Sequence, residues 1–194
     1  MSSISCYIPE YKDLIYKLAL FAYHYHKDNT KFKQIAYNTL LKINKLEVPI
    51  YVYTDGACTN NGKKNAKAGV GVYFSEGDTR NISEKVSSTY NQTNNVAELL
   101  AILKALIMLR QEIDTGKKIV VYTDSEYSIG VITGKMKAAK NLELIKDIKS
   151  LYRDNVKFQH INSHVDKKLW PEAERKHYYG NFKADELATN AVKN

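Results

Sequence analysis

Two apolar segments of the chain each lead into an aspartate, and these two aspartates are the first candidates for chemistry. The segments are Val52-Tyr53-Thr54-Asp55 and Val121-Tyr122-Thr123-Asp124. In open α/β sheets, ligands bind beyond the carboxyl ends of the strands. If the two strands are neighbours, the carboxylates lie close together and repel, and a hard divalent cation with oxygen ligands relieves that repulsion. For either aspartate alone, the alternative is a cap on the turn or helix that follows.

Two further carboxylates stand in short polar motifs near expected helix starts. Glu98 follows Thr93-Asn94-Asn95, and Asp185 follows Gly180-Asn181 by a few residues. Each has a structural alternative. Asn95 as N-cap with Glu98 three positions later forms a capping box, and an acidic side chain in a first helical turn interacts favourably with the helix dipole. The sequence around Glu98 and Asp185 alone is compatible with either a structural role or a role in a functional site.

Taken in order, these motifs resemble those of the ribonuclease H type 1 family. The matching segments are Thr54-Asp55-Gly56-Ala57-Cys58, Asn94-Asn95-Val96-Ala97-Glu98-Leu99, Thr123-Asp124-Ser125, and Gly180-Asn181-x-x-Ala184-Asp185-x-Leu187-Ala188. The resemblance covers about residues 48–192. It implies an RNase H-like fold, a five-stranded mixed sheet flanked by helices. It also implies an endonuclease that hydrolyses the RNA strand of RNA–DNA hybrids, largely without sequence preference, leaving 5′-phosphate and 3′-hydroxyl ends.

The resemblance further implies the cofactor and the residues that hold it. Asp55, Glu98, Asp124 and Asp185 would bind two Mg²⁺ ions, with Mn²⁺ as a substitute and Asp55 bridging both. One ion would activate a water molecule and the other would stabilise the leaving 3′ oxygen. His164 matches a family histidine that assists proton transfer or product release. Its alternative is an exposed loop histidine.

Substrate-binding residues follow from the same resemblance. Asn61, Asn94 and Asn95 match polar residues that touch the minor groove, including the 2′-hydroxyls that distinguish RNA from DNA. Thr93 and Asn141 match residues that hold a phosphate of the DNA strand, a contact that carries no base preference. Turn and cap chemistry is the alternative for the asparagines.

Composition and charge agree with a soluble protein that binds a polyanion. Lys and Arg outnumber Asp and Glu by 29 to 21, a formal charge of +8, and a basic surface attracts phosphodiester backbones. No apolar run is long enough to cross a bilayer, and the first residues lack the pattern of a secretory signal. Cys6 and Cys58 are far apart and form no C-x-x-C pair, which argues against zinc and favours reduced thiols in an intracellular protein.

The elements expected to position these residues form two regions. Apolar stripes at helical spacing predict an N-terminal helical hairpin over residues 1–47, which could pack on the catalytic domain, contact nucleic acid or mediate dimerisation. Residues 48–194 are expected to form the catalytic domain. Strands are predicted at 48–54, 68–74, 82–86, 119–123 and 156–161, and helices at 96–112, 125–132, 142–152 and 182–192. This order predicts an α/β domain with a mixed sheet.

Two segments depart from the family pattern. The short Gly134–Lys140 stretch stands where many members carry a long basic protrusion. The segment 165–180, between His164 and the Asp185 motif, is basic and longer than the corresponding segment in most family members. Pro171 is predicted to start a short helix that ends before Gly180. We hypothesise that this insert contacts nucleic-acid phosphates beside the active site. The alternative is a solvated basic loop with Trp170 packed on the domain.

Three other functions compete with hybrid cleavage. The same fold could serve a nuclease that acts on DNA, which the match of Asn94-Asn95 to RNA-reading positions disfavours. It could be a reverse-transcriptase-derived domain, or a hybrid-binding module that has lost catalysis. The last is disfavoured because all four carboxylates are present.

Overall fold

The structure is a computed structural model that describes Lys17, Gln34–Ile35, residues 49–163 and residues 165–193. The predicted N-terminal hairpin and its boundary with the catalytic domain therefore lie outside the described residues, apart from Lys17, Gln34 and Ile35, which are helical. Across the described part of the chain, no helix combines the length and the apolar character needed to cross a membrane.

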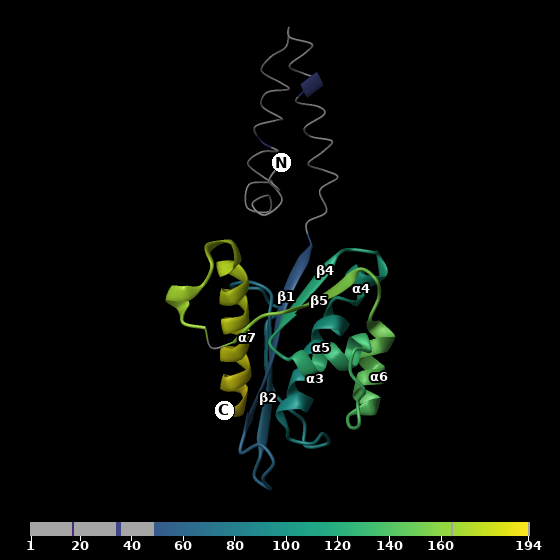
Figure 1. The fold of residues 1–194 in the computed structure, drawn as a ribbon, viewed down its shortest axis with the longest axis vertical. Helices are drawn as coiled ribbons and strands as arrows, with labels where there is room; N and C mark the ends of the chain where they lie inside the picture. Colours follow the sequence, from purple (N-terminus) through teal and green to yellow (C-terminus); the bar gives the residue numbers. More distant parts are fainter. Residues whose placement is uncertain (1–16, 18–33, 36–48, 164, 194) are drawn as a thin grey trace. The chain divides into compact units, whose positions relative to one another are not determined.

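Residues 49–193 are built on a five-stranded mixed sheet with the order β3-β2-β1-β4-β5 (Figure 1). Its strands are β1 (Ile50–Thr59), β2 (Lys67–Tyr73), β3 (Ile82–Lys85), β4 (Ile119–Thr123) and β5 (Val156–His160). β1 pairs antiparallel with β2 and parallel with β4, and β4 pairs parallel with β5. The predicted mixed sheet is confirmed.

Helices cover both faces of this sheet (Figure 1). α7 (Arg175–Lys193) packs on β1, β2 and β3 from one side, and α3 (Asn94–Met108) packs on β1 and β2 from the other. α6 (Leu142–Leu151) and α5 (Glu126–Thr133) lie against α3, which continues into the short α4 (Arg110–Asp114). The main core fills the space between the sheet and α3, where Val52, Val121, Leu99 and Ile102 are fully buried.

Alternation along β1 assigns its residues to the two faces of the sheet, because successive side chains of a strand point to opposite sides. Val52 belongs to the core under α3. Tyr53 belongs to a smaller cluster under α7 with Tyr73 and Ala184. The central strands β1, β2 and β4 are therefore largely buried, which explains why they are mostly apolar, whereas the edge strands β3 and β5 are more exposed.

β1 is longer than predicted. We expected it to end before Asp55, but antiparallel pairing with β2 carries it on to Thr59, opposite Lys67. Asp55 consequently lies inside the strand, opposite Gly71. Because this extension depends on pairing with a separate strand, the sequence around Asp55 could not show it.

The C-terminal helix also differs from the prediction. It begins at Arg175, not near residue 182, and runs through Gly180 without a break. The predicted separate helix that starts at Pro171 and ends before Gly180 is wrong. Two short 3-10 turns, Lys167–Leu169 and Glu172–Glu174, precede α7 instead. Gly180 lies in the helix interior and packs against the ring of Tyr53, with which any side chain at this position would collide. The glycine serves close packing, although its sequence context suggested a helix end.

An aromatic stack under α7 surrounds His177. Its ring lies parallel to that of Tyr122, with centroids 4.3 Å apart and planes at 15°. Its Nδ1 atom is 3.0 Å from the hydroxyl of Tyr53, and Tyr51 and Lys176 lie close by. Burial, and then the charge of Lys176, lowers the pKa of His177.

We expect His177 to make stability depend on pH. Its pKa is lower in the folded chain than in the unfolded one, so the folded chain prefers the neutral ring, and stability is lost as pH falls below about 6.5. His177→Phe should remove this slope, and loss of the bond to Tyr53 should cost about 1 kcal/mol at neutral pH. Urea unfolding at several pH values measures both effects. An unchanged acid slope in the variant would contradict the assignment.

Candidate metal and catalytic site

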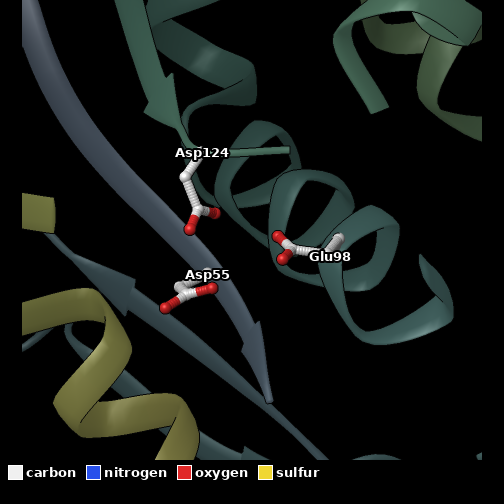
Figure 2. A group of neighbouring side chains, drawn as sticks. All are labelled: Asp55, Glu98 and Asp124. Atoms are coloured by element: carbon white, nitrogen blue, oxygen red, sulfur yellow. The ribbon is translucent and has the colours of Figure 1, made fainter. Parts of the chain in front are cut away.

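Three carboxyl groups converge at the centre of the sheet. Oxygens of Asp55, Glu98 and Asp124 all lie within 4.8 Å of one another, and Figure 2 shows the three groups pointing toward a common point. They come from three elements: β1, α3 and the end of β4. Residues far apart in sequence thus form one acidic cluster.

Strand register accounts for two of the three. β1 and β4 are parallel neighbours in which Tyr53 lies opposite Tyr122. Two residues further along each chain, Asp55 and Asp124 therefore reach the same level on the same face. The prediction that two neighbouring strands deliver these carboxylates side by side is confirmed.

Gly56 explains how Glu98 reaches the cluster. A side chain at Gly56 would collide with the backbone of Ala97 and Glu98, so only glycine lets α3 approach β1 this closely. Glu98 is 4% exposed, and its Oε1 atom accepts a hydrogen bond of 3.5 Å from the side chain of Asn94.

The helix caps and helix bounds exclude a capping or dipole role for three of these carboxylates. Thr93, and not Asn95, caps α3, because its hydroxyl accepts from the amide of Val96. Ser125, the residue after Asp124, caps α5 by accepting from the amide of Ser128. Asp185 lies in the middle of α7 and not in its first turn. Capping and the helix dipole therefore do not explain Glu98, Asp124 or Asp185.

Asp185 approaches the cluster from the α7 side. The backbone of Ala184 packs directly on Gly71, where a side chain would collide with the Ala184 carbonyl. Gly71 is the strand partner of Asp55, so this contact holds Asp185 beside Asp55. The charge of Asp185 contributes to the raised pKa of Asp55.

The buried carboxylates of the cluster repel one another, and a bound cation would relieve this repulsion. Burial, followed by the charges of Asp124 and Asp185, raises the pKa of Asp55 to about 8. Burial and the charge of Asp55 raise the pKa of Glu98. Glu98 Oε2 and Asp124 Oδ1 are buried and have no hydrogen-bond partner among the described residues. Clustered carboxylate oxygens with free lone pairs are the ligands that Mg²⁺ and Mn²⁺ prefer, so these residues fit a divalent metal.

Two supporting contacts fix the orientation of the aspartates. The amide of Gly56 donates to Asp55 Oδ1 at 2.7 Å. His160, at the end of β5, has its Nε2 atom 3.2 Å from the carbonyl oxygen of Asp124. Sequence reasoning missed His160, and also the packing roles of Gly56 and Gly71. The signal for His160 would have been its place on β5. This strand pairs with β4, and His160 lies opposite Thr123, the residue before Asp124.

The residues expected to bind substrate also come together. Asn61, Thr93, Asn95 and Asn141 line one groove of about 840 Å³. Asn94 lies beside them, because its amide donates to Asn61 Oδ1 at 3.4 Å and its side chain contacts Glu98. The groove therefore leads to the acidic cluster. Its lining also contains four lysines, Lys63, Lys64, Lys137 and Lys140. The predicted His164 lies outside the described residues.

Comparisons with known proteins agree with this geometry. The RNase H family model matches residues 47–193. Ribonuclease H of Schizosaccharomyces pombe is 32% identical over 96% of this chain and 68% of its own length. Ribonuclease H1 of Mus musculus is 32% identical over 74% of the chain, which spans only half of that relative.

A solved structure shares the fold. LC11-RNase H1 in complex with an RNA/DNA hybrid superposes with a TM-score of 0.51 and 25% identity, covering 74% of this chain and 96% of that one. The family model covers most of the chain, and the acidic cluster lies inside the matched region. The chain belongs to the ribonuclease H family and resembles its type 1 members.

Proposed function

We propose that this chain hydrolyses the RNA strand of RNA–DNA hybrids with two bound divalent metal ions, leaving 5′-phosphate and 3′-hydroxyl ends. The observation that carries the proposal is the convergence of Asp55, Glu98 and Asp124, with Asp185 beside Asp55. Membership of the ribonuclease H family supports the reaction class. The hybrid bound to LC11-RNase H1 supports the substrate class.

Each carboxylate has a role that its place in the cluster supports. Asp55 interacts with both Asp124 and Asp185, so it would be the residue shared by two bound ions. Glu98 and Asp124 each present an unpartnered buried oxygen, and Asp185 is supplied by α7. When bound, divalent ions activate water and neutralise charge on the leaving oxygen. Mg²⁺ is the expected physiological ion, and Mn²⁺ should replace it.

The chain itself contributes rigidity. The Gly56 amide holds Asp55, the Asn94 side chain holds Glu98, and His160 holds the backbone of Asp124. These contacts fix the carboxylates before substrate arrives, so little reorganisation is needed in the reaction. His164 is proposed to move a proton at the reacting phosphate or to help product leave.

The lysine-lined groove is proposed to hold the backbone of the hybrid. Thr93 and Asn141 would bind a phosphate of the DNA strand, and Asn61, Asn94 and Asn95 would read the RNA strand from the minor groove. Asn141 begins α6 with a left-handed backbone and, among the described residues, makes no cap hydrogen bond with its side chain. That side chain is therefore available to a ligand.

Replacing two groove lysines should weaken binding in a salt-dependent way. We expect the double variant Lys137→Gln, Lys140→Gln to reduce the slope of log Kd against log salt by about 1 per lysine that contacts a phosphate. The control variant Lys85→Gln, Lys193→Gln removes the same charge from exposed residues on β3 and at the end of α7. Equal slopes in the two variants would show that the groove does not bind the hybrid.

A strand-specific cleavage assay tests the proposed function. RNA–DNA hybrid, DNA duplex and RNA duplex, each labelled on one strand, are incubated with the full chain and Mg²⁺. We expect cleavage of the RNA strand of the hybrid alone, with products that a polymerase extends from their 3′-hydroxyls. Cleavage of the DNA duplex would favour a DNA nuclease, and hybrid binding without cleavage would favour a non-catalytic module.

A further inference from the structure

A second pocket lies beside the acidic cluster, between α7 and the segment that precedes it. Its volume is about 550 Å³, within the range of roughly 300–1,000 Å³ found for small-ligand sites. Asp185 lines it at the edge shared with the acidic cluster. The pocket is also lined by Lys167, Trp170, Tyr178, Asn181 and Phe182.

One wall of the pocket is aromatic. The rings of Trp170 and Tyr178 are stacked, with centroids 5.9 Å apart and planes at 24°, and Phe182 lies 6.5 Å from Trp170. The indole N–H donates to the carbonyl of Val165 at 3.1 Å, which holds the ring in this orientation. A fixed aromatic wall is a platform on which a nucleic-acid base can stack, whatever its identity.

Asn181 gives the pocket a hydrogen-bond acceptor that lacks a donor. The residue is 4% exposed, and its Oδ1 atom has no hydrogen-bond partner among the described residues. A buried acceptor without a donor is unfavourable, so a ligand that donates a hydrogen bond here is stabilised. A phosphate oxygen cannot donate, whereas a hydroxyl can.

Lys167 supplies the cation of the pocket. Its ammonium lies 3.6 Å from the centroid of the Phe182 ring, at the same wall as Trp170. The neighbouring Asp166 carboxylate accepts from the amide of Lys168 and so caps the 3-10 turn Lys167–Leu169. The pocket thus combines a stacking surface, a hydrogen-bond acceptor and a positive charge.

We propose that this pocket binds a ribonucleoside 5′-phosphate unit, with its base on the aromatic wall, its 2′-hydroxyl donating to Asn181 and its phosphate near Lys167. Within an RNA strand the 3′-hydroxyl is esterified, so the 2′-hydroxyl is the sugar donor common to every ribonucleotide, whereas exocyclic amines occur only on some bases. Because Asp185 lines the same pocket, the unit belongs to the RNA strand next to the cleaved bond. This last step rests on the proposed function, while nucleotide binding itself does not.

Trp170 allows a direct test, because it is the only tryptophan in the chain. Its fluorescence is measured in the full chain without divalent metal while adenosine 5′-monophosphate, its 2′-deoxy analogue, adenosine or inorganic phosphate is added. We expect saturable quenching by the ribonucleotide, with roughly three- to tenfold weaker binding of the deoxy analogue, the effect of one lost hydrogen bond. Equal affinity for the ribo and deoxy forms, or no saturable quenching, would overturn the proposal.

Two pairs of variants identify the contacts. Asn181→Ala should abolish the preference for the ribonucleotide, whereas Asn190→Ala, at an exposed position of the same helix, should keep it. Lys167→Ala should weaken the binding of adenosine 5′-monophosphate but not that of adenosine. Lys168→Ala should weaken the binding of neither compound. Lys167 is exposed, so its variant stays folded even if Asn181→Ala does not. Full binding of adenosine 5′-monophosphate by Lys167→Ala would contradict the assigned phosphate contact.

The inference and the proposed function fail separately. Asp124→Asn should lose hybrid cleavage and keep nucleotide quenching, because Asp124 does not line this pocket. If the wild-type chain discriminates between the nucleotides but cuts no hybrid, only the proposed function is wrong. If it cuts the hybrid but Trp170 does not respond to nucleotide, only the pocket assignment is wrong.

Discussion

Asp124→Asn is expected to lower the rate of hybrid cleavage by about 10³-fold or more. The amide has nearly the shape of the carboxylate but loses the charge that holds a divalent ion. Such an ion stabilises the transition state by several kcal/mol, and each 1.36 kcal/mol is tenfold in rate. The measurement is single-turnover cleavage of a labelled hybrid at saturating Mg²⁺.

The same substitution should stabilise the metal-free protein. Asp124 is one of the charges that raise the pKa of the buried Asp55, so its neutralisation relieves repulsion inside the fold. Thermal unfolding in a chelator should therefore give a higher Tm for Asp124→Asn than for the wild type. The control is Asp147→Asn, at an exposed position of α6, which should change neither activity nor Tm. An active Asp124→Asn enzyme would refute the role assigned to this residue.

Gly71→Ala is the substitution expected to damage the fold most. A methyl group at this position meets the carbonyl of Ala184 and the amide of Ala188, both backbone atoms of α7. Backbone cannot move aside as a flexible side chain can, so the helix must shift away from the sheet. We expect a loss of about 3 kcal/mol or more in the free energy of unfolding. Displacement of α7 also moves Asp185 from Asp55, so activity should fall beyond the loss of folded protein.

Gly77→Ala separates this steric effect from backbone strain. Gly77 has a φ of +71° and open space around its Cα, so its alanine variant should lose only about 1–2 kcal/mol from the left-handed conformation. Activity per folded molecule should remain at the wild-type level. Urea unfolding and active-fraction assays compare the two variants. If Gly71→Ala were no less stable and no less active than Gly77→Ala, close packing of α7 on β2 would not position the site.

Local patterns predict much of this fold because they are set by short-range chemistry. The β-branched and aromatic run around Val52 and the similar run around Val121 identify the two central strands and the aspartates that follow. Thr93 and Ser125 are ordinary N-cap types, although the pattern favoured Asn95 for the first of these helices. Four short motifs in a fixed order were enough to identify the family and to nominate every carboxylate of the cluster.

What the sequence could not show depends on contacts between distant segments. β1 extends beyond Asp55 because β2 pairs with it. α7 runs through Gly180 because that glycine faces Tyr53. His160 supports Asp124 only because β4 and β5 are neighbours. The pocket at Asn181 likewise exists only where the segment before α7 folds back on that helix.

The central claim is that the acidic cluster binds divalent metal, and Mn²⁺ binding followed by electron paramagnetic resonance tests it most directly. The signal of free Mn²⁺ should decrease as the wild-type chain is added, since bound ions become undetectable in solution spectra. Asp55→Asn should lose this effect, and Mg²⁺ should compete in the wild type. If the wild-type chain and Asp55→Asn left the free Mn²⁺ signal equally unchanged, the cluster would not be a metal site.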